Sequence, residues 1–132
     1  MIKDLKIHEA LTCNAENSIV EVAKQLRDHT ARHAYVLDKD MKPLGIISAV
    51  DINNKVVAED ADTNQLKAWD IMNSPVDFVD IKQEVEFAMS IMMKRKTYSC
   101  LVTEDGKAKG VVDYGTVMDR IIKKLREEEN GS

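Results

Sequence analysis

Cysteine is scarce in this chain: Cys13 and Cys100 are too few for a disulfide framework, and they show no zinc-binding spacing. Apolar runs are short, and none approaches the roughly 18 residues that a membrane-spanning helix needs. The stretch Met1–Lys6 contains an acidic residue and is followed by no apolar segment, so a secretory signal is not expected. These absences predict a cytoplasmic protein that does not span a membrane.

Glycine and proline are also few, with five and two residues, so the chain is neither collagen-like nor of low complexity. Its 132 residues fit one compact module and leave no room for the separate cofactor and substrate domains of larger enzymes. The formal charge of −4 gives no general attraction to a phosphate backbone, so nucleic-acid binding is disfavoured. With 44% apolar residues, a folded core is expected.

The sequence contains an internal repeat, in which Ser18–Ile52 aligns with Gln83–Val117. The two segments share six identities in 35 positions, and seven further positions exchange one apolar residue for another. Because composition alone predicts roughly two identities, we infer two copies of one structural unit. The first copy with its linker is placed at residues 1–66, and the second at residues 67–132.

Each copy shows the same order of helix and strand patterns. In the first copy, Ser18 begins a capping pattern ahead of an amphipathic helix. The apolar runs 34–37 and 44–47, separated by a polar turn, predict a β-hairpin. A second helix is expected to open at Asp51 in the first copy and at Thr116 in the second.

Opening strands at residues 10–13 and 76–79 complete a β-α-β-β-α unit in each copy. A unit of about 60 residues buries too little surface to be stable alone. We therefore expect an α/β (α+β) fold in which two pseudo-twofold repeats pack sheet to sheet. The outer helix faces are expected to form a homodimer surface that includes Met89, Met92, Met93, Ile121 and Ile122. Core packing is the alternative for these methionines and for Met118.

These features together resemble a tandem cystathionine-β-synthase (CBS) domain pair, also called a Bateman module. The runs Gly45–Ile52, His33–Asp38, Trp69–Val76 and Gly110–Val112 carry the resemblance. It implies a non-catalytic regulatory module that binds AMP, ADP, ATP or S-adenosylmethionine in the cleft between the repeats, with no required cofactor. It also implies a homodimer and the regulation of an attached or separate partner protein.

The family's ribose motif is a glycine, two apolar residues, Ser or Thr, two further residues and Asp. Residues 45–51, which include Ser48 and Asp51, match it completely. A hydroxyl and a carboxylate at a helix start can fix a sugar diol, and the helix amides and dipole favour a nearby phosphate. Without a ligand, the same two residues would cap the helix.

The resemblance also implies contacts to the phosphate and the adenine in the first copy. Arg32 and His33 stand where the family commonly meets phosphate, although they would equally suit a solvated helix-to-strand connection. The adenine is expected among residues of the opening strand, with an apolar residue beneath it. This set comprises Leu11, Thr12, Cys13 and Ile47.

The second copy departs from the ribose motif. Asp113 puts a charge where a hydroxyl is expected, and Thr116 lacks the carboxylate. Tyr98 replaces His33, and Phe78 lies on the opening strand. We therefore expect a second, weaker ligand site at Asp113, Thr116, Tyr98 and Phe78.

Other classes of function compete with that of a ligand sensor. The sequence has no phosphate-cradling glycine loop, nucleophile elbow or zinc-protease motif, and its three histidines show no metal-ligand spacing. No catalytic or metal site is therefore predicted. The main alternative is a ligand-independent dimerisation or scaffold module whose motif has decayed. A nucleotide-dependent enzyme is a third alternative, which ATP turnover would reveal.

Overall fold

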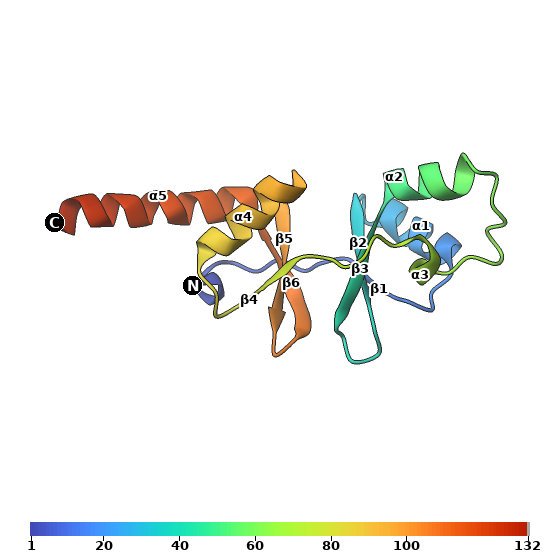
Figure 1. The fold of residues 1–132 in the computed structure, drawn as a ribbon, viewed down its shortest axis with the longest axis horizontal. Helices are drawn as coiled ribbons and strands as arrows, with labels where there is room; N and C mark the ends of the chain where they lie inside the picture. Colours follow the sequence, from blue (N-terminus) through green and yellow to red (C-terminus); the bar gives the residue numbers. More distant parts are fainter. Residues whose placement is uncertain (132) are drawn as a thin grey trace. The chain divides into compact units, whose positions relative to one another are not determined.

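The computed structural model describes residues 1–131, which form two three-stranded sheets with their helices (Figure 1). The chain divides into two compact units. The first unit is Ala10–Val76, and the second unit is Met1–Glu9 together with the chain from Asp77 onward. The units therefore differ from the sequence copies expected at 1–66 and 67–132. Residues 1–9 belong to the unit formed by the second copy, and residues 67–76 belong to the unit formed by the first.

The first unit contains one sheet in the order β1-β2-β3. Its strands are β1 (Thr12–Asn14), β2 (His33–Leu37) and β3 (Pro43–Ser48). Strand β1 is parallel to β2, and β3 is antiparallel to it, which confirms the predicted hairpin. The helices are α1 (Ile19–Asp28), α2 (Ala49–Ile52), which continues into the π-helical turn η2 (Asn53–Val57), and α3 (Ala68–Ile71).

The second unit repeats this plan with strands in the order β4-β5-β6. Its elements are η1 (Ile2–Asp4), β4 (Phe78–Asp80), α4 (Val85–Arg95), β5 (Ser99–Glu104), β6 (Lys107–Asp113) and α5 (Tyr114–Gly131). Both second helices begin earlier than the predicted Asp51 and Thr116. The reason is that Ser48 and Asp113 are the capping residues, since their side chains accept hydrogen bonds from amides of the first turn.

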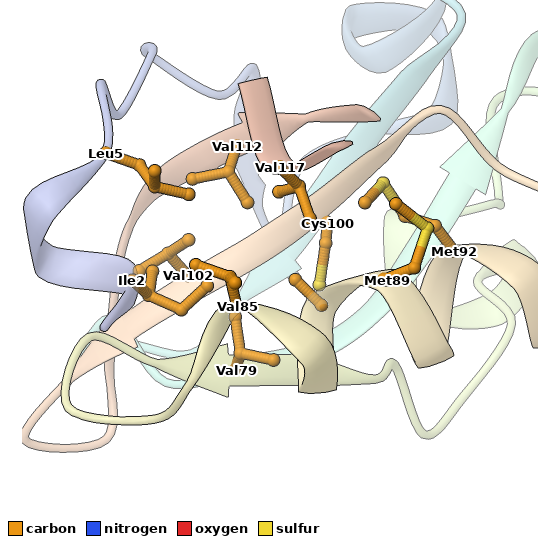
Figure 2. Packing of buried hydrophobic residues seen from close by; sticks show 11 residues of the cluster. Ile2, Leu5, Val79, Val85, Met89, Met92, Cys100, Val102, Val112 and Val117 are labelled. Carbon is orange, nitrogen blue, oxygen red and sulfur yellow. The ribbon is translucent and has the colours of Figure 1, made fainter. Parts of the chain in front are cut away.

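Buried apolar side chains form two clusters, one within each unit. Figure 2 shows the cluster of the second unit, which includes Met89 and Met92 of α4 and Val117 of α5. Met89 and Met92 are only 9% and 1% exposed, so they pack in the core and do not lie on an outer dimer face. Met93, by contrast, is 70% exposed.

The strand pairings of the two sheets give an alignment between the units that differs in part from the alignment of the sequence repeat. Val36 pairs with Gly45 in the first sheet, and Val102 pairs with Gly110 in the second. The two glycines match as the repeat predicts, but the structural counterpart of Val36 is Val102 and not Leu101, with which the repeat aligns it. The difference arises because the hairpin turn of the second unit is shorter by a single position.

Gly45 and Gly110 each allow a chain segment to cross the last strand of a sheet. In the first unit, the backbones of Asn73 and Ile46 exchange hydrogen bonds of 3.0 and 2.9 Å. In the second unit, His8 exchanges hydrogen bonds of 2.8 and 2.9 Å with β6. A Cβ on Gly45 would lie 2.7 Å from the carbonyl oxygen of Asn73, and one on Gly110 would collide with the carbonyl group of His8. Glycine is needed at both positions because the backbones approach so closely.

Within residues 1–131, every helix is too short or too polar to pass through a lipid bilayer.

Candidate functional site

One end of the first sheet carries most of the residues predicted to bind ligand. The start of β1, the start of β2 and the end of β3 meet there, because β1 is parallel and β3 antiparallel to β2. Strand β2 donates an amide hydrogen bond of 2.9 Å to the carbonyl oxygen of Leu11, and His33 pairs with Ser48. The first amide of α2 donates a 3.2 Å hydrogen bond to the carbonyl oxygen of Arg32.

Ser48 and Asp51 hold each other at the start of α2. Ser48 Oγ accepts a hydrogen bond from the Asp51 amide at 3.0 Å, and Asp51 Oδ2 accepts one from the Ser48 amide at 2.8 Å. This reciprocal arrangement is a capping box. Partial burial by itself raises the pKa of Asp51, but hydrogen bonds from Ser48 and Asn73 and the charge of Lys55 outweigh burial and lower it. The carboxylate is therefore ionised at neutral pH.

Asn73 and Lys55 also belong to this polar cluster, although sequence reasoning did not identify them. Asn73 Nδ2 donates a 2.9 Å hydrogen bond to Asp51 Oδ2. Lys55 Nζ donates hydrogen bonds of 2.8 Å to Asn73 Oδ1 and 3.0 Å to the carbonyl oxygen of Ile71. An acid, an amide and a base are thus joined in one chain of contacts. No motif signals it, because Asn73 reaches the site from the segment that crosses β3.

His33 and Arg32 lie beside this cluster at the start of β2. His33 is half-buried, and burial lowers its pKa. The charge of Asp51 acts in the opposite direction, while that of Arg32 lowers the pKa further. His33 is therefore a neutral imidazole at neutral pH, with one donor and one acceptor nitrogen. Arg32 is exposed and supplies a positive charge next to it.

The four residues predicted to surround the adenine do not share one environment. Cys13 and Ile47 are 5% and 0% exposed and pack in the core cluster with side chains of α1 and α3. Burial raises the pKa of the Cys13 thiol to about 11. Thr12 is half-buried and, because side chains alternate along a strand, lies on the sheet face opposite Cys13. Leu11 is also half-buried and packs against the edge of the core cluster.

The second unit also has a carboxylate and a hydroxyl at the start of its second helix, in exchanged positions. Asp113 Oδ1 accepts a 2.7 Å hydrogen bond from the Thr116 amide, and Asp113 Oδ2 lies 3.1 Å from His8 Nε2. The hydrogen bond from the Thr116 amide lowers the pKa of Asp113, and contact with His8 adds to this effect. Asp113 therefore caps α5 and is already held by a side chain.

Tyr98 does not take the place of His33, contrary to the sequence prediction. Ser99 pairs with Asp113 as His33 pairs with Ser48, so Ser99 is the structural counterpart of His33. The prediction failed because β5 is displaced by a single position relative to the alignment that the sequence repeat gives for β2.

Tyr98 instead corresponds to Arg32. The Tyr114 amide donates a 2.8 Å hydrogen bond to its carbonyl oxygen, as the first amide of α2 does to Arg32. The Tyr98 side chain is 76% exposed and meets the Tyr114 ring edge to face, with the ring centroids 6.1 Å apart. Phe78 of β4 is 42% exposed. Tyr98 therefore places an exposed aromatic ring where the first unit has the basic Arg32, and Phe78 adds a second exposed ring at the start of β4.

No group of three His, Cys, Asp or Glu side chains among residues 1–131 is arranged so that it could hold a metal ion.

Two copies of a three-stranded sheet with helices, each with a carboxylate and a hydroxyl at the start of its second helix, define a tandem-repeat α+β module. The CBS domain family model matches residues 2–58 and 68–123. The chain therefore belongs to the CBS domain family, and the resemblance inferred from the sequence is confirmed. Such domain pairs are regulatory modules.

Two curated relatives differ greatly in size from this chain. An uncharacterised protein of Methanopyrus kandleri is 29% identical over 111 residues, which cover 83% of this chain and 57% of that protein. The L-aspartate semialdehyde sulfurtransferase of Methanocaldococcus jannaschii is 33% identical over 88 residues, which cover 62% of this chain and 17% of that enzyme. The matched region is thus just over half of one relative and under a fifth of the other.

Solved structures of CBS proteins show the same fold. A CBS domain pair/ACT domain protein from Thermotoga maritima has a TM-score of 0.76 at 15% identity, covering 94% of this chain and 98% of that one. A CBS domain protein from Pyrobaculum aerophilum, complexed with AMP, has a TM-score of 0.72 at 24% identity, with coverages of 87% and 88%. The predicted α+β fold of a CBS domain pair is confirmed.

Proposed function

We propose that this CBS domain pair is a non-catalytic regulatory module that binds an adenine nucleotide or another adenosyl ligand, such as S-adenosylmethionine. The proposed site is the end of the first sheet that carries Ser48 and Asp51. The observation that carries the proposal is the ionised Asp51 carboxylate, held in place beside His33 and Arg32. The AMP bound to the Pyrobaculum protein supports this class of ligand.

Each group in the proposed site has a role that follows from its chemistry. Asp51 accepts hydrogen bonds from the two hydroxyls of a ribose, while the Ser48 hydroxyl donates to a ligand oxygen. Arg32 provides the charge that attracts a phosphate, and neutral His33 adds a hydrogen bond without repelling Arg32. Leu11 and Thr12 line the site of the adenine. Cys13 and Ile47 pack in the core behind these two residues.

A second and weaker ligand site is proposed in the second unit, at Asp113, Thr116, Tyr98 and Phe78. Its weakness follows because both carboxylate oxygens of Asp113 are engaged, Oδ1 by the Thr116 amide and Oδ2 by His8, so a ligand hydroxyl would have to replace one of these contacts. Exposed Tyr98 and Phe78 offer aromatic rings on which a base can stack.

The experiment that tests the main site is a calorimetric titration of AMP, ADP, ATP and S-adenosylmethionine into the parent protein and Asp51→Ala. The matched control is Asp70→Ala, because Asp70 Oδ2 accepts a 2.9 Å hydrogen bond from the Lys67 amide in the same capping geometry at α3. Loss of hydrogen bonds to a charged group predicts about 10- to 100-fold weaker binding for Asp51→Ala. Equal affinity of Asp51→Ala and the parent would reduce Asp51 to a helix cap.

The second candidate function is that of a dimerisation or scaffold module that needs no ligand. Exposed apolar side chains on α4 and α5 favour a homodimer: Phe87, Met93, Ile122 and Leu125 are 54%, 70%, 40% and 55% exposed. Sedimentation equilibrium of Leu125→Glu tests this, with Val57→Glu as a control at a 67% exposed apolar residue of η2. We expect Leu125→Glu alone to be monomeric at micromolar concentration, and a monomeric parent would contradict the homodimer.

The cysteines favour a reducing compartment such as the cytoplasm, since Cys13 and Cys100 are both free thiols. Burial raises their pKa values to about 11 and 12, with the charge of Asp77 adding to the effect at Cys100. Neither thiol is therefore suited to nucleophilic catalysis, in keeping with a module that acts through a separate regulated protein.

A further inference from the structure

The Asn73 side chain lies between an acid and a base. Its Nδ2 donates to Asp51 Oδ2 at 2.9 Å, and its Oδ1 accepts from Lys55 Nζ at 2.8 Å. Chemistry fixes this orientation, because a reversed amide would set its carbonyl oxygen against the carboxylate and its NH2 group against the ammonium group. Asn73 is therefore a donor to Asp51.

The backbone of Asn73 is also fixed. Its amide and carbonyl groups exchange two hydrogen bonds with Ile46, the residue before the buried Ile47. The close approach that Gly45 permits brings this segment against β3. The side chain therefore extends from a fixed point toward the start of α2.

The hydrogen bonds of Asp51 divide its two carboxylate oxygens into different roles. The Ser48 amide and Asn73 Nδ2 both donate to Oδ2, at 2.8 and 2.9 Å. Two donors on one oxygen restrict rotation of the carboxylate and leave Oδ1 to accept from a ligand hydroxyl.

We propose that Asn73 is a positioning residue of the adenosyl site. Its side chain holds Oδ2 of Asp51 so that Oδ1 receives the ribose hydroxyls. This inference rests on the proposed function of the Asp51 site. It assigns a ligand-binding contribution to the segment that crosses β3, outside the Gly45–Asp51 motif.

The second unit provides independent support for this arrangement. The shift that aligns Ser18 with Gln83 in the sequence repeat also aligns His8 with Asn73. His8 crosses β6 at Gly110, as Asn73 crosses β3, and contacts Asp113 with its side chain. Both units thus place a polar side chain of the crossing segment on the carboxylate at the start of the second helix. The recurrence shows that this contact is a regular feature of the unit.

Two substitutions separate the donor role of Asn73 from its packing. Asn73→Asp has the same shape and keeps an acceptor for Lys55, but it removes the donor to Asp51 and adds a like charge. Asn73→Ala removes both contacts. The control is Asn64→Ala, at an exposed residue of the linker.

Affinity for AMP, measured by calorimetry, is expected to fall about 3- to 10-fold in Asn73→Ala, because one charge-assisted hydrogen bond acts on the ligand only through Asp51. Asn73→Asp is expected to lose more affinity for AMP than Asn73→Ala, and Asn64→Ala is expected to bind AMP as tightly as the parent. In an Asp51→Ala background, Asn73→Ala should add no further loss, since both substitutions remove the same interaction.

A ligand-free measurement completes the test. The pKa of the Asp51 carboxyl group, followed by carbon NMR during a pH titration, should be higher in Asn73→Ala than in the parent. Unchanged AMP affinity in Asn73→Ala, or losses that add to those of Asp51→Ala, would overturn the positioning role while leaving the proposed function intact. A parent protein that binds none of the four ligands would refute the proposed function, and the positioning role with it.

Discussion

His8 and Asn73 contact carboxylates in the same way in the two units, although one side chain is an imidazole and the other an amide. His8 Nε2 lies 3.1 Å from Asp113 Oδ2, and Asn73 Nδ2 lies 2.9 Å from Asp51 Oδ2. The two carboxylates differ in their position relative to the helix. Asp51 is the third residue of α2, whereas Asp113 is the capping residue before α5. The crossing segment and the helix start thus share one geometry in both units, while the chemistry at each position differs.

The close crossing at Gly45 predicts a large loss of stability on substitution. In Gly45→Ala, the new Cβ would lie 2.7 Å from the Asn73 carbonyl oxygen and 2.8 Å from the Met72 sulfur. Because the backbone cannot yield without losing the hydrogen bonds to Ile46, we expect destabilisation of about 1–3 kcal/mol in urea unfolding.

Gly115→Ala is the matched comparison for Gly45→Ala. Its Cβ would meet only Asp113 Oδ1 at an ordinary 3.5 Å, and alanine favours the helix by up to about 1 kcal/mol. Equal stability of Gly45→Ala and the parent would show that the crossing segment is free to move away from β3.

The sequence predicted the repeat, both hairpins and the Ser48–Asp51 pair, because these depend on local patterns. It misplaced residues of the second copy ahead of the hairpin turn, because that turn is shorter by a single position and one constant shift cannot align both sides of it. The repeat aligns Val20 with the identical Val85, yet Val20 is 37% exposed and Val85 fully buried. Ile19, only 1% exposed, is the true counterpart of Val85. The role of Asn73 had no local signal, since it depends on a crossing between segments far apart in the chain.

The capping of α5 predicts different costs for two substitutions in the second unit. Asp113→Ala removes the acceptor of the Thr116 amide and should destabilise the protein by about 1 kcal/mol in thermal or urea unfolding. Thr116→Ala keeps that amide and should cost less than about 0.5 kcal/mol. The reverse order would restore Thr116 as the residue that opens the helix.

His33 provides a spectroscopic measure of the charge on Asp51. That charge raises the His33 pKa against the larger lowering effect of burial. Asp51→Asn should therefore lower the His33 pKa further, as measured from the imidazole proton shifts during a pH titration. An unchanged His33 pKa would mean that the two side chains do not interact electrostatically in solution.

The low pKa values of Asp51 and Asp113 predict a loss of stability in acid. Both lie below the usual value of 3.8, at Asp51 through hydrogen bonds that outweigh burial and at Asp113 chiefly through the Thr116 amide. As the pH falls through 3.8, the unfolded chain binds protons at these positions before the folded protein does. The stabilisation is thus complete above that pH and is lost below it.

This acid sensitivity is measured as the midpoint of urea unfolding between about pH 3 and pH 6. The double variant Asp51→Asn, Asp113→Asn should be less stable than the parent at pH 6 and should lose less stability on acidification, because neither position can take up a proton. Parallel curves for parent and double variant would show that other carboxylates cause the acid transition. Loss of AMP affinity through Asp51 should begin only below pH 3.8, because the folded protein keeps this carboxylate ionised above that pH and a protonated Asp51 no longer presents a charged acceptor to the ribose.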